Sequence, residues 1–304
     1  MTMCPRTMAE SPAGSTERIV PERRRSMAAI AAALLVVGGA WRDAVGATSP
    51  ATDPPDRKIA LVIGNGKYLI GPLKNPVNDA QAVAASLTML GFEVTLREDA
   101  TLRDMVEAMR GFSAQAQHAG VRLIYYAGHG VQVRGRNYLL PVDAQIQSED
   151  EVAGRSADVN ELLERMSTIR HGINIVILDA CRNNPFSGGE IVGPDGRRLK
   201  FRGATPAGLA PVDAPIGTMV AFSTAPGGVA LDNPGARNSL YTRHLLEHIQ
   251  APGLPIELLF KQVRLGVARE TGRVQVPWES SSLTGDFCFR PGQSGRCDAT
   301  ILRR

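Results

Sequence analysis

Short apolar runs separated by amphipathic segments dominate the chain from residue 58 onward. Unbroken apolar runs are typical of strands that are buried on both faces of a sheet. Residues 59–63, 121–126 and 173–178 show this pattern most clearly. The sequence predicts strands at 59–63, 92–96, 121–126, 138–141, 173–178 and 217–223, with a break after the third strand at 127–130.

Apolar residues recur at helical spacing between these runs. Asn75 followed by Pro76 is typical of a helix start, and Thr101 is a good cap for a second helix that includes Phe112. Strands that alternate with helices through short turns form βαβ units and predict a parallel sheet. The sequence predicts helices at 75–91, from Thr101 past Phe112, and at 157–169, 237–249 and 255–269, and irregular structure at 276–287.

The N-terminal region has a different character. Arg23, Arg24 and Arg25 precede an apolar run at 27–40, and small residues up to Ala47 follow it. A basic region, a short apolar run and a small-residue exit are typical of a secretory signal. We therefore expect a signal peptide at 1–47, a Pro-rich linker at 48–57, and an exported protein, periplasmic or secreted. Whether it is free or tethered to a membrane stays open, as does a start at Met8 or Met27.

Composition narrows the function classes. The chain has 304 residues, 43% of them hydrophobic, with 34 Lys and Arg against 30 Asp and Glu. Without residues 1–47, which hold six Arg and four acids, 257 residues remain with 28 basic and 26 acidic side chains, a net charge of +2. This near balance argues against a nucleic-acid partner. No apolar run reaches the roughly 18 residues that a membrane-spanning helix needs.

Three of the four cysteines can be interpreted without catalysis. Cys4 lies in the expected signal peptide, and Cys288 and Cys297 are nine residues apart, which permits a small disulfide in an oxidising compartment. No metal site is expected there, because no further ligand has suitable spacing. His244 and His248 lie four residues apart on a predicted helix, but a third ligand is missing, so a solvated face is the better interpretation.

Two reactive residues follow neighbouring predicted strands. His129 comes after the strand at 121–126 and Cys181 after the strand at 173–178, and 181 − 129 = 52 residues separate them. Ligands bind at the carboxyl ends of parallel strands. A cysteine nucleophile needs a base, and imidazole titrates near neutral pH. Glycines flank His129, and the amides of Gly130 and Cys181 could bind an oxyanion. Alone, His129 could be a structural turn residue and Cys181 a small buried hydrophobe.

A long segment at 182–215 separates the predicted strand at 173–178 from the one at 217–223. It contains the basic residues Arg197, Arg198, Lys200 and Arg202, and it can be a solvated surface loop or a processing site. Two other enzyme classes fit poorly. Residues 64–68 lack the spacing of a phosphate-binding P-loop, and residues 292–296 lack the last glycine of a serine hydrolase motif.

Residues 58–289 resemble the caspase-like cysteine peptidases, in particular the bacterial metacaspase-like branch. The resemblance implies an α/β fold, a three-layer α/β/α sandwich around a mostly parallel six-stranded sheet. It also implies a peptidase domain at 58–290, with a p20-like part at 58–190, a basic loop at 191–215 and a p10-like part at 216–290, before a tail at 291–304. The matching stretches are KIALVIGNGKY, LKNPVNDA, LIYYAGHGVQV, YLLPVDA, VILDACRNNPF, AFSTAPGGVALD and PWESSSLTGDF.

The resemblance assigns roles to particular residues. Cys181 matches the nucleophile, His129 the general base, and Gly130 an oxyanion-hole donor. Asp79 and Asp179 match acids that line the S1 pocket of metacaspases and select Arg or Lys at P1, a preference that two carboxylates explain electrostatically. The bland alternatives are a first-turn helix acid for Asp79 and a turn-ordering acid for Asp179. The chain has Asp-Ala-Cys-Arg-Asn where animal caspases have Gln-Ala-Cys-x-Gly, which disfavours aspartate specificity.

Further expectations follow from the same resemblance. Ser223 and Thr224 are expected on a strand that binds the substrate backbone by β-addition. Self-cleavage is expected in the basic loop, at one of Arg197, Arg198, Lys200 or Arg202. The substrates are peptides or proteins, no cofactor is expected, and the oligomeric state stays open. Metacaspases are often activated by calcium, but no segment here has the spacing of a calcium loop. The alternative function is a catalytically silent caspase-like module that binds peptides or proteins.

Overall fold

The computed structural model describes part of the chain. The described residues are 57–169, 171–181, 191–192, 198–199, 209–226, 228, 230 and 235–298, of which Cys181, 191–192 and 198–199 are described for their backbone alone. They belong to a compact unit that spans Ser49–Arg304. The expected signal peptide at 1–47 and residues 48–56 of the expected linker lie outside the described residues. Within the described part, no helix combines the length and apolar character that crossing a membrane requires.

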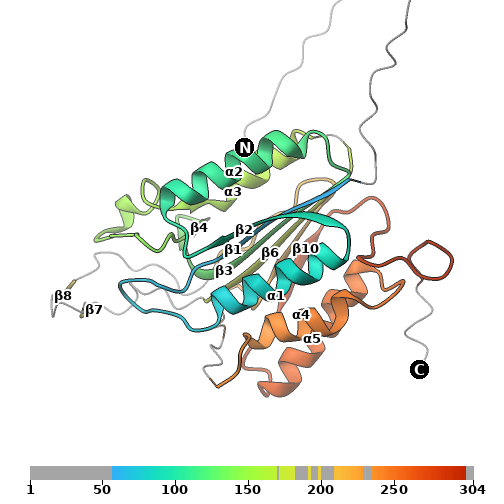
Figure 1. Cartoon of the computed structure of the whole chain (residues 1–304). Helices are drawn as coiled ribbons and strands as arrows, with labels where there is room; N and C mark the ends of the chain where they lie inside the picture. Colours follow the sequence, from blue (N-terminus) through green and yellow to red (C-terminus); the bar gives the residue numbers. More distant parts are fainter. Residues whose placement is uncertain are drawn as a thin grey trace, which may run out of the picture. The chain divides into compact units, whose positions relative to one another are not determined.

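A mostly parallel sheet forms the centre of this unit (Figure 1). Its central path runs in the order β10-β9-β6-β3-β1-β2, and every neighbouring pair is parallel except β10 with β9. The predicted mostly parallel sheet is confirmed, but the whole sheet has eight strands, and its six-strand path includes β10, which was not among the predicted strands. The path consists of β1 (Lys58–Gly64), β2 (Phe92–Glu98), β3 (Val121–Val133), β6 (Ile173–Cys181), β9 (Thr218–Phe222) and β10 (Trp278–Ser281).

Short strands extend this sheet at the end of β3. The strand β4 (Arg136–Leu139) pairs antiparallel with β3 and with β5 (Ala157–Asp158). A separate antiparallel pair, β7 (Ile191–Val192) and β8 (Arg198–Leu199), lies in the segment that was expected to be a loop.

Helices cover both faces of the sheet, which gives the three-layer sandwich (Figure 1). One face packs against α1 (Pro76–Met89), α4 (Leu240–Ile249) and α5 (Ile256–Glu270), and the other packs against α2 (Leu102–Ala116) and α3 (Val159–Ser167). A 3-10 turn, η1 (Glu149–Glu151), precedes β5. Alternate residues of each strand face opposite layers: Tyr125 belongs to the core with α4 and α5, whereas Ile124 belongs to the core with α2 and α3.

Local sequence explains where the helices begin. Pro76 occupies the first turn of α1 as predicted. Thr101 and Asp104 form a reciprocal capping box at the start of α2. Ser239 caps α4 by accepting a hydrogen bond from the backbone of Thr242, a contact that becomes important at the site.

Four predictions about elements were wrong. The strand β3 does not break at 127–130 but continues to Val133, because the residues after Gly128 pair with β4. The polar segment 276–287 contains the edge strand β10. The helix expected at 157–169 begins only at Val159, because Ala157–Asp158 form β5. Ser223 and Thr224 follow β9 instead of lying on it.

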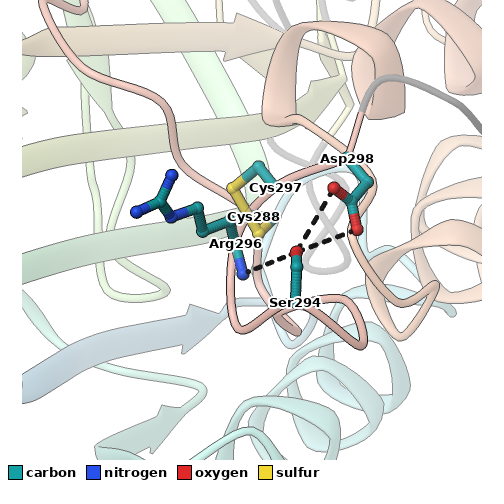
Figure 2. Close-up of a disulfide and its surroundings, with 5 residues drawn as sticks. All are labelled: Cys288, Ser294, Arg296, Cys297 and Asp298. Atoms are coloured by element: carbon teal, nitrogen blue, oxygen red, sulfur yellow. Dashed lines mark hydrogen bonds between the residues drawn. A yellow bond between two sulfur atoms is a disulfide. The ribbon is translucent and has the colours of Figure 1, made fainter.

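A disulfide closes the loop after the last strand. Cys288 and Cys297 are bonded, and the Oγ atom of Ser294 donates a hydrogen bond to the carboxylate of Asp298 (Figure 2). The backbone N–H of Asp298 donates to the carbonyl of Gly253, in the connection between α4 and α5. The loop is therefore fixed both within itself and to the helical layer.

Candidate active site

The strand register aligns the backbones of the two candidate catalytic residues. Strands β3 and β6 run parallel from Val121 opposite Ile173 to His129 opposite Cys181. Cys181 is the last residue of β6, and parallel neighbours lie about 4.8 Å apart. The two residues, 52 apart in sequence, thus occupy adjacent positions on neighbouring strands, at the point where β6 ends and β3 continues to Val133. The Cys181 side chain lies outside the described part of the structure.

The imidazole of His129 is oriented by a main-chain acceptor. The side chain is buried, with 4% of the residue exposed, and Nε2 lies 2.6 Å from the carbonyl oxygen of Gly71. A carbonyl only accepts hydrogen bonds, so Nε2 carries the proton in this geometry, and Nδ1 of the neutral ring has the lone pair of a base. Gly71 has a positive φ of +64°, and a Cβ there would lie 3.3 Å from Nε2.

Two tyrosines hold the backbone of His129. Its N–H donates to the hydroxyl of Tyr68 at 2.9 Å, and its carbonyl accepts from the hydroxyl of Tyr126 at 2.7 Å and from the N–H of Leu140 at 3.0 Å. The rings of Tyr68 and His129 are also in contact, with centroids 4.4 Å apart and planes tilted by 49°. Sequence reasoning missed both tyrosines, although Tyr68 ends the stretch KIALVIGNGKY.

The N–H of Gly130 points away from β4. The bond from Leu140 N to His129 O places the carbonyl of His129 on the β4 side of β3, and the N–H of the next residue, Gly130, points to the opposite side. Leu140 also accepts from Asn65, the residue after β1, so β4 lies on the β1 side of β3. The Gly130 N–H therefore points to the β6 side of β3, where β6 ends at Cys181.

Close neighbours explain why position 130 is a glycine. A Cβ there would lie 3.2 Å from Cβ of Ala180 and 3.1 Å from a methyl carbon of Leu209. Leu209 is buried and belongs to the described C-terminal part of the basic loop. Asn137 fixes the same segment by donating to the carbonyl of Ala210 and accepting from its N–H. A larger residue at 130 would displace these contacts.

The two candidate S1 acids are buried beside the start of α4. Asp79, on α1, is 1% exposed and accepts from Nδ2 of Asn238 at 2.8 Å and from the backbone N–H of Ser239 at 2.9 Å. Asp179, on β6, is 8% exposed and accepts from Oγ of Ser239 at 2.5 Å and from Oγ1 of Thr242 at 2.8 Å. Ser239 thus bonds to both carboxylates, which brings the two acids together.

The negative charge of the acids affects neighbouring phenols. Burial raises the pKa of Tyr125 well above its ordinary value, and the charges of Asp179 and Asp79 raise it further. Burial and Asp179 likewise raise the pKa of Tyr241. The hydroxyl oxygen of Tyr125 also lies 2.5 Å from Oγ1 of Thr242. Sequence reasoning missed this ring of donors; only the cap position of Ser239 was detectable as a local signal.

The expected substrate strand is not formed by Ser223 and Thr224. Both are buried and lie just beyond the end of β9. The N–H of Ser223 donates to the carbonyl of Leu178, and its carbonyl accepts from the side chain of Gln275. The backbone of Ser223 is therefore already engaged within the chain, which corrects the expectation of β-addition at this residue.

The other predicted sites have different outcomes. His244 is not on a solvated face: it is buried and contacts the carboxylates of Glu247 and Glu270, each at 2.9 Å. Across the described ranges, no cluster of three or more His, Cys, Asp or Glu side chains has metal-binding geometry. Of the expected self-cleavage residues, Arg197, Lys200 and Arg202 lie outside the described residues, and Arg198 is described only as backbone of β8.

A cavity of about 340 Å³ lies away from these residues, between α2 and α3. Its lining includes Met109, Tyr138 and Leu162, and none of the candidate catalytic or S1 residues. Because α2 and α3 cover the face of the sheet opposite α1 and α4, this cavity is separate from the acid pair.

Comparisons with known proteins show which sequences this chain is similar to. The family model for the caspase domain of peptidase family C14 matches residues 57–288. Human mucosa-associated lymphoid tissue lymphoma translocation protein 1 is 34% identical over 134 residues, which cover 43% of this chain and 16% of the relative. Its mouse homolog is 34% identical over 126 residues, 41% of this chain and 15% of the relative. Pig caspase-1 is 25% identical over 253 residues, 77% of this chain and 60% of the relative. The chain thus spans less than two thirds of each of these relatives.

Proposed function

The chain belongs to the caspase-domain family, and from that premise we propose that it is a cysteine endopeptidase with Cys181 as the nucleophile and His129 as the general base. The observation that carries the proposal is the register of β3 and β6, in which these two residues are opposite each other. A thiol and an imidazole at adjacent positions of neighbouring strands are the minimum that nucleophilic catalysis by cysteine needs.

The chemistry follows from the tautomer of His129. The N–H at Nε2 of His129 donates a hydrogen bond to the carbonyl of Gly71, which leaves Nδ1 to accept the proton of the Cys181 thiol. The thiolate attacks the scissile carbonyl, a C–S bond forms, and the N–H groups of Gly130 and Cys181 bind the oxyanion. Nδ1 then gives its proton to the leaving amine as the C–N bond breaks. Water hydrolyses the acyl-enzyme by the same proton transfers in reverse order, which regenerates the thiol.

The acid pair supports a basic residue at P1. Asp79 and Asp179 are buried and share the donor Ser239. Burial raises the pKa of Tyr125, and the negative charges of the two acids raise it further. A guanidinium or ammonium group gains energy in this field, whereas an acidic P1 side chain is repelled. We propose cleavage after Arg or Lys, in peptide or protein substrates.

A fluorogenic panel tests the reaction and the specificity together. Peptides with Arg, Lys or Asp at P1 are assayed with wild type and with Cys181→Ala and His129→Ala, each with and without calcium. We expect hydrolysis of the Arg and Lys peptides by wild type alone. Preference for Asp would refute the role of the acid pair. Absence of hydrolysis, together with no labelling of Cys181 by an Arg-chloromethylketone, would favour the silent binding module.

Self-cleavage and export are further proposals. We propose that the enzyme cuts its own basic loop after Arg197, Arg198, Lys200 or Arg202, because these residues fit the proposed P1 preference. N-terminal sequencing of wild type and Cys181→Ala checks this; intact chains in both would contradict it. Export of a protein cleaved after Ala47 is supported by the Cys288–Cys297 disulfide, which persists in oxidising compartments. Fractionation and N-terminal sequencing of the mature protein test this proposal.

A further inference from the structure

Two buried tyrosine hydroxyls connect the N–H and the carbonyl of His129. Tyr68 is 8% exposed and Tyr126 is 0% exposed, and their hydroxyl oxygens are 3.0 Å apart. The N–H of His129 donates to Tyr68, and the carbonyl of His129 accepts from Tyr126. The two residues come from different segments, Tyr68 from the loop after β1 and Tyr126 from β3.

The direction of each hydrogen bond follows from counting protons. The acceptors near Tyr126 are the carbonyls of His129, at 2.7 Å, and Leu140, at 2.9 Å, so the single proton of Tyr126 goes to a carbonyl. The oxygen of Tyr126 can then accept the proton of Tyr68. The hydroxyl of Tyr68 also lies 3.2 Å from the carbonyl oxygen of Leu140. When its proton goes to Tyr126 instead, at 3.0 Å, a closed circuit leads from the N–H of His129 through Tyr68 and Tyr126 to the carbonyl of His129.

Gly128 provides the space that these hydroxyls occupy. A Cβ at this position would lie 2.5 Å from the hydroxyl oxygen of Tyr68 and 2.7 Å from that of Tyr126. Gly128 also has a φ of +153°, which other residues rarely adopt. The absence of a side chain at Gly128 therefore lets both tyrosine hydroxyls reach the backbone of His129, while β3 continues to Val133.

We propose that Tyr68 and Tyr126 are positioning residues that fix His129 for proton transfer with Cys181. The inference rests on the proposed function, because it concerns how the base of that reaction is aimed. Tyr68 contacts His129 in two ways: its hydroxyl accepts a hydrogen bond from the backbone N–H, and its ring packs against the tilted imidazole. Together with Gly71 at Nε2, these contacts fix the direction of Nδ1, and reaction rates are sensitive to displacements of about 1 Å.

Phenylalanine substitutions test the two hydroxyls and keep the rings. Tyr68→Phe leaves the buried N–H of His129 without its acceptor, and we expect kcat on an Arg peptide to fall about 10- to 100-fold, with KM changed less than about twofold. Tyr126→Phe should cost less, because the His129 carbonyl keeps the N–H of Leu140. Tyr138→Phe is the matched control: Tyr138 is buried in β4, lies outside the hydroxyl circuit, and should keep wild-type rates.

A second measurement separates positioning from mere structure. Alkylation of Cys181 by iodoacetamide is followed against pH by mass spectrometry of the tryptic peptide 171–182, in wild type, the three phenylalanine variants and His129→Ala. Imidazole assistance extends the reactive range of the thiol to lower pH. We expect the profiles of Tyr68→Phe and Tyr126→Phe to lie between those of wild type and His129→Ala, with thermal unfolding confirming that each variant is folded.

The outcomes distinguish this inference from the proposed function. If wild type differs from His129→Ala but Tyr68→Phe matches wild type in both kcat and pH profile, the positioning role is refuted and the peptidase remains. If wild type and His129→Ala have the same profile and neither hydrolyses peptide, the dyad itself is refuted, and the inference with it. If Tyr68→Phe does not fold, the profile of Tyr126→Phe decides: a wild-type profile overturns the inference.

Discussion

Replacing Thr242 by valine would remove one hydroxyl from the buried network around the acid pair and keep the shape of the side chain. Oγ1 of Thr242 donates to Asp179 at 2.8 Å and lies 2.5 Å from the hydroxyl of Tyr125. Since the one proton of Thr242 goes to the carboxylate, Tyr125 is the donor in the second bond. The valine variant keeps the backbone bond from residue 242 to Ser239, so the cap of α4 survives.

The expected loss of stability is the sum of two terms. A hydrogen bond to a charged group contributes about 1.5–3 kcal/mol, and a buried donor left without an acceptor costs about 1–3 kcal/mol. Because Thr242 is fully buried and Tyr125 lies in the core, both terms apply in full. Helix propensity adds little, since threonine and valine are close on that scale. We expect Thr242→Val to lower the free energy of unfolding by about 2.5–6 kcal/mol.

Equilibrium unfolding in urea, arranged as a double-mutant cycle, is the assay. Tyr125→Phe alone should cost only about 1 kcal/mol, because Thr242 keeps its bond to Asp179. The double variant should be less destabilised than the sum of the two single variants by about 1–2 kcal/mol. The reason is that Tyr125→Phe removes the buried hydroxyl that Thr242→Val leaves without an acceptor. A cost for Thr242→Val below about 1 kcal/mol, or additivity within about 0.5 kcal/mol, would refute the assignment of donors.

Three further predictions concern glycine, disulfide and charge. Gly128→Ala should lower stability by about 2–4 kcal/mol and abolish activity, since its methyl would lie 2.5 Å from a tyrosine hydroxyl; thermal unfolding and the peptide assay measure this, and a wild-type melting temperature would contradict it. Cys288→Ser or Cys297→Ser should cost about 2–3 kcal/mol; reductant should produce the same loss in wild type and none in the variants. Hydrogen bonding to His244 lowers the pKa of Glu270 below 4.5, so its contribution to stability is present above pH 4.5 and is lost as the pH falls through the lowered pKa. Glu270→Gln should lower the urea midpoint at pH 7, with a difference that shrinks in acid; a constant difference would argue against the charge.

The fold was predictable where sequence and environment agree. The apolar runs of β1, β3 and β6 are buried on both faces, so their composition alone identifies them. The edge strand β10 has only four residues, with largely exposed or half-buried side chains, and its pairing depends on the distant β9. Such a strand lacks the periodicity on which prediction depends. The continuation of β3 past Gly128 likewise depends on pairing with β4, and the residues around Gly128 do not indicate that pairing.

The residues of the candidate site likewise fall into those that the sequence could locate and those that it could not. Cys181 and His129 could be located because both follow buried apolar runs that are visible in the sequence. The donors to the acids and to the histidine backbone could not, since Thr242 is 63 residues from Asp179 and Tyr68 is 61 residues from His129. Ser239 was recognisable as a possible cap, but its bonds to two carboxylates depend on how α4 docks against the sheet.

The basic loop interrupts the chain between the two halves of the acid site. Asp79 and Asp179 precede residue 191, whereas Asn238, Ser239 and Thr242 follow residue 215. Cleavage of the chain between residues 191 and 215 would separate it into two fragments. The parallel pairing of β6 with β9 would still hold the two fragments together. The two fragments should therefore co-elute as a heterodimer under native conditions and separate only in denaturant, and neither fragment should recognise a substrate by itself.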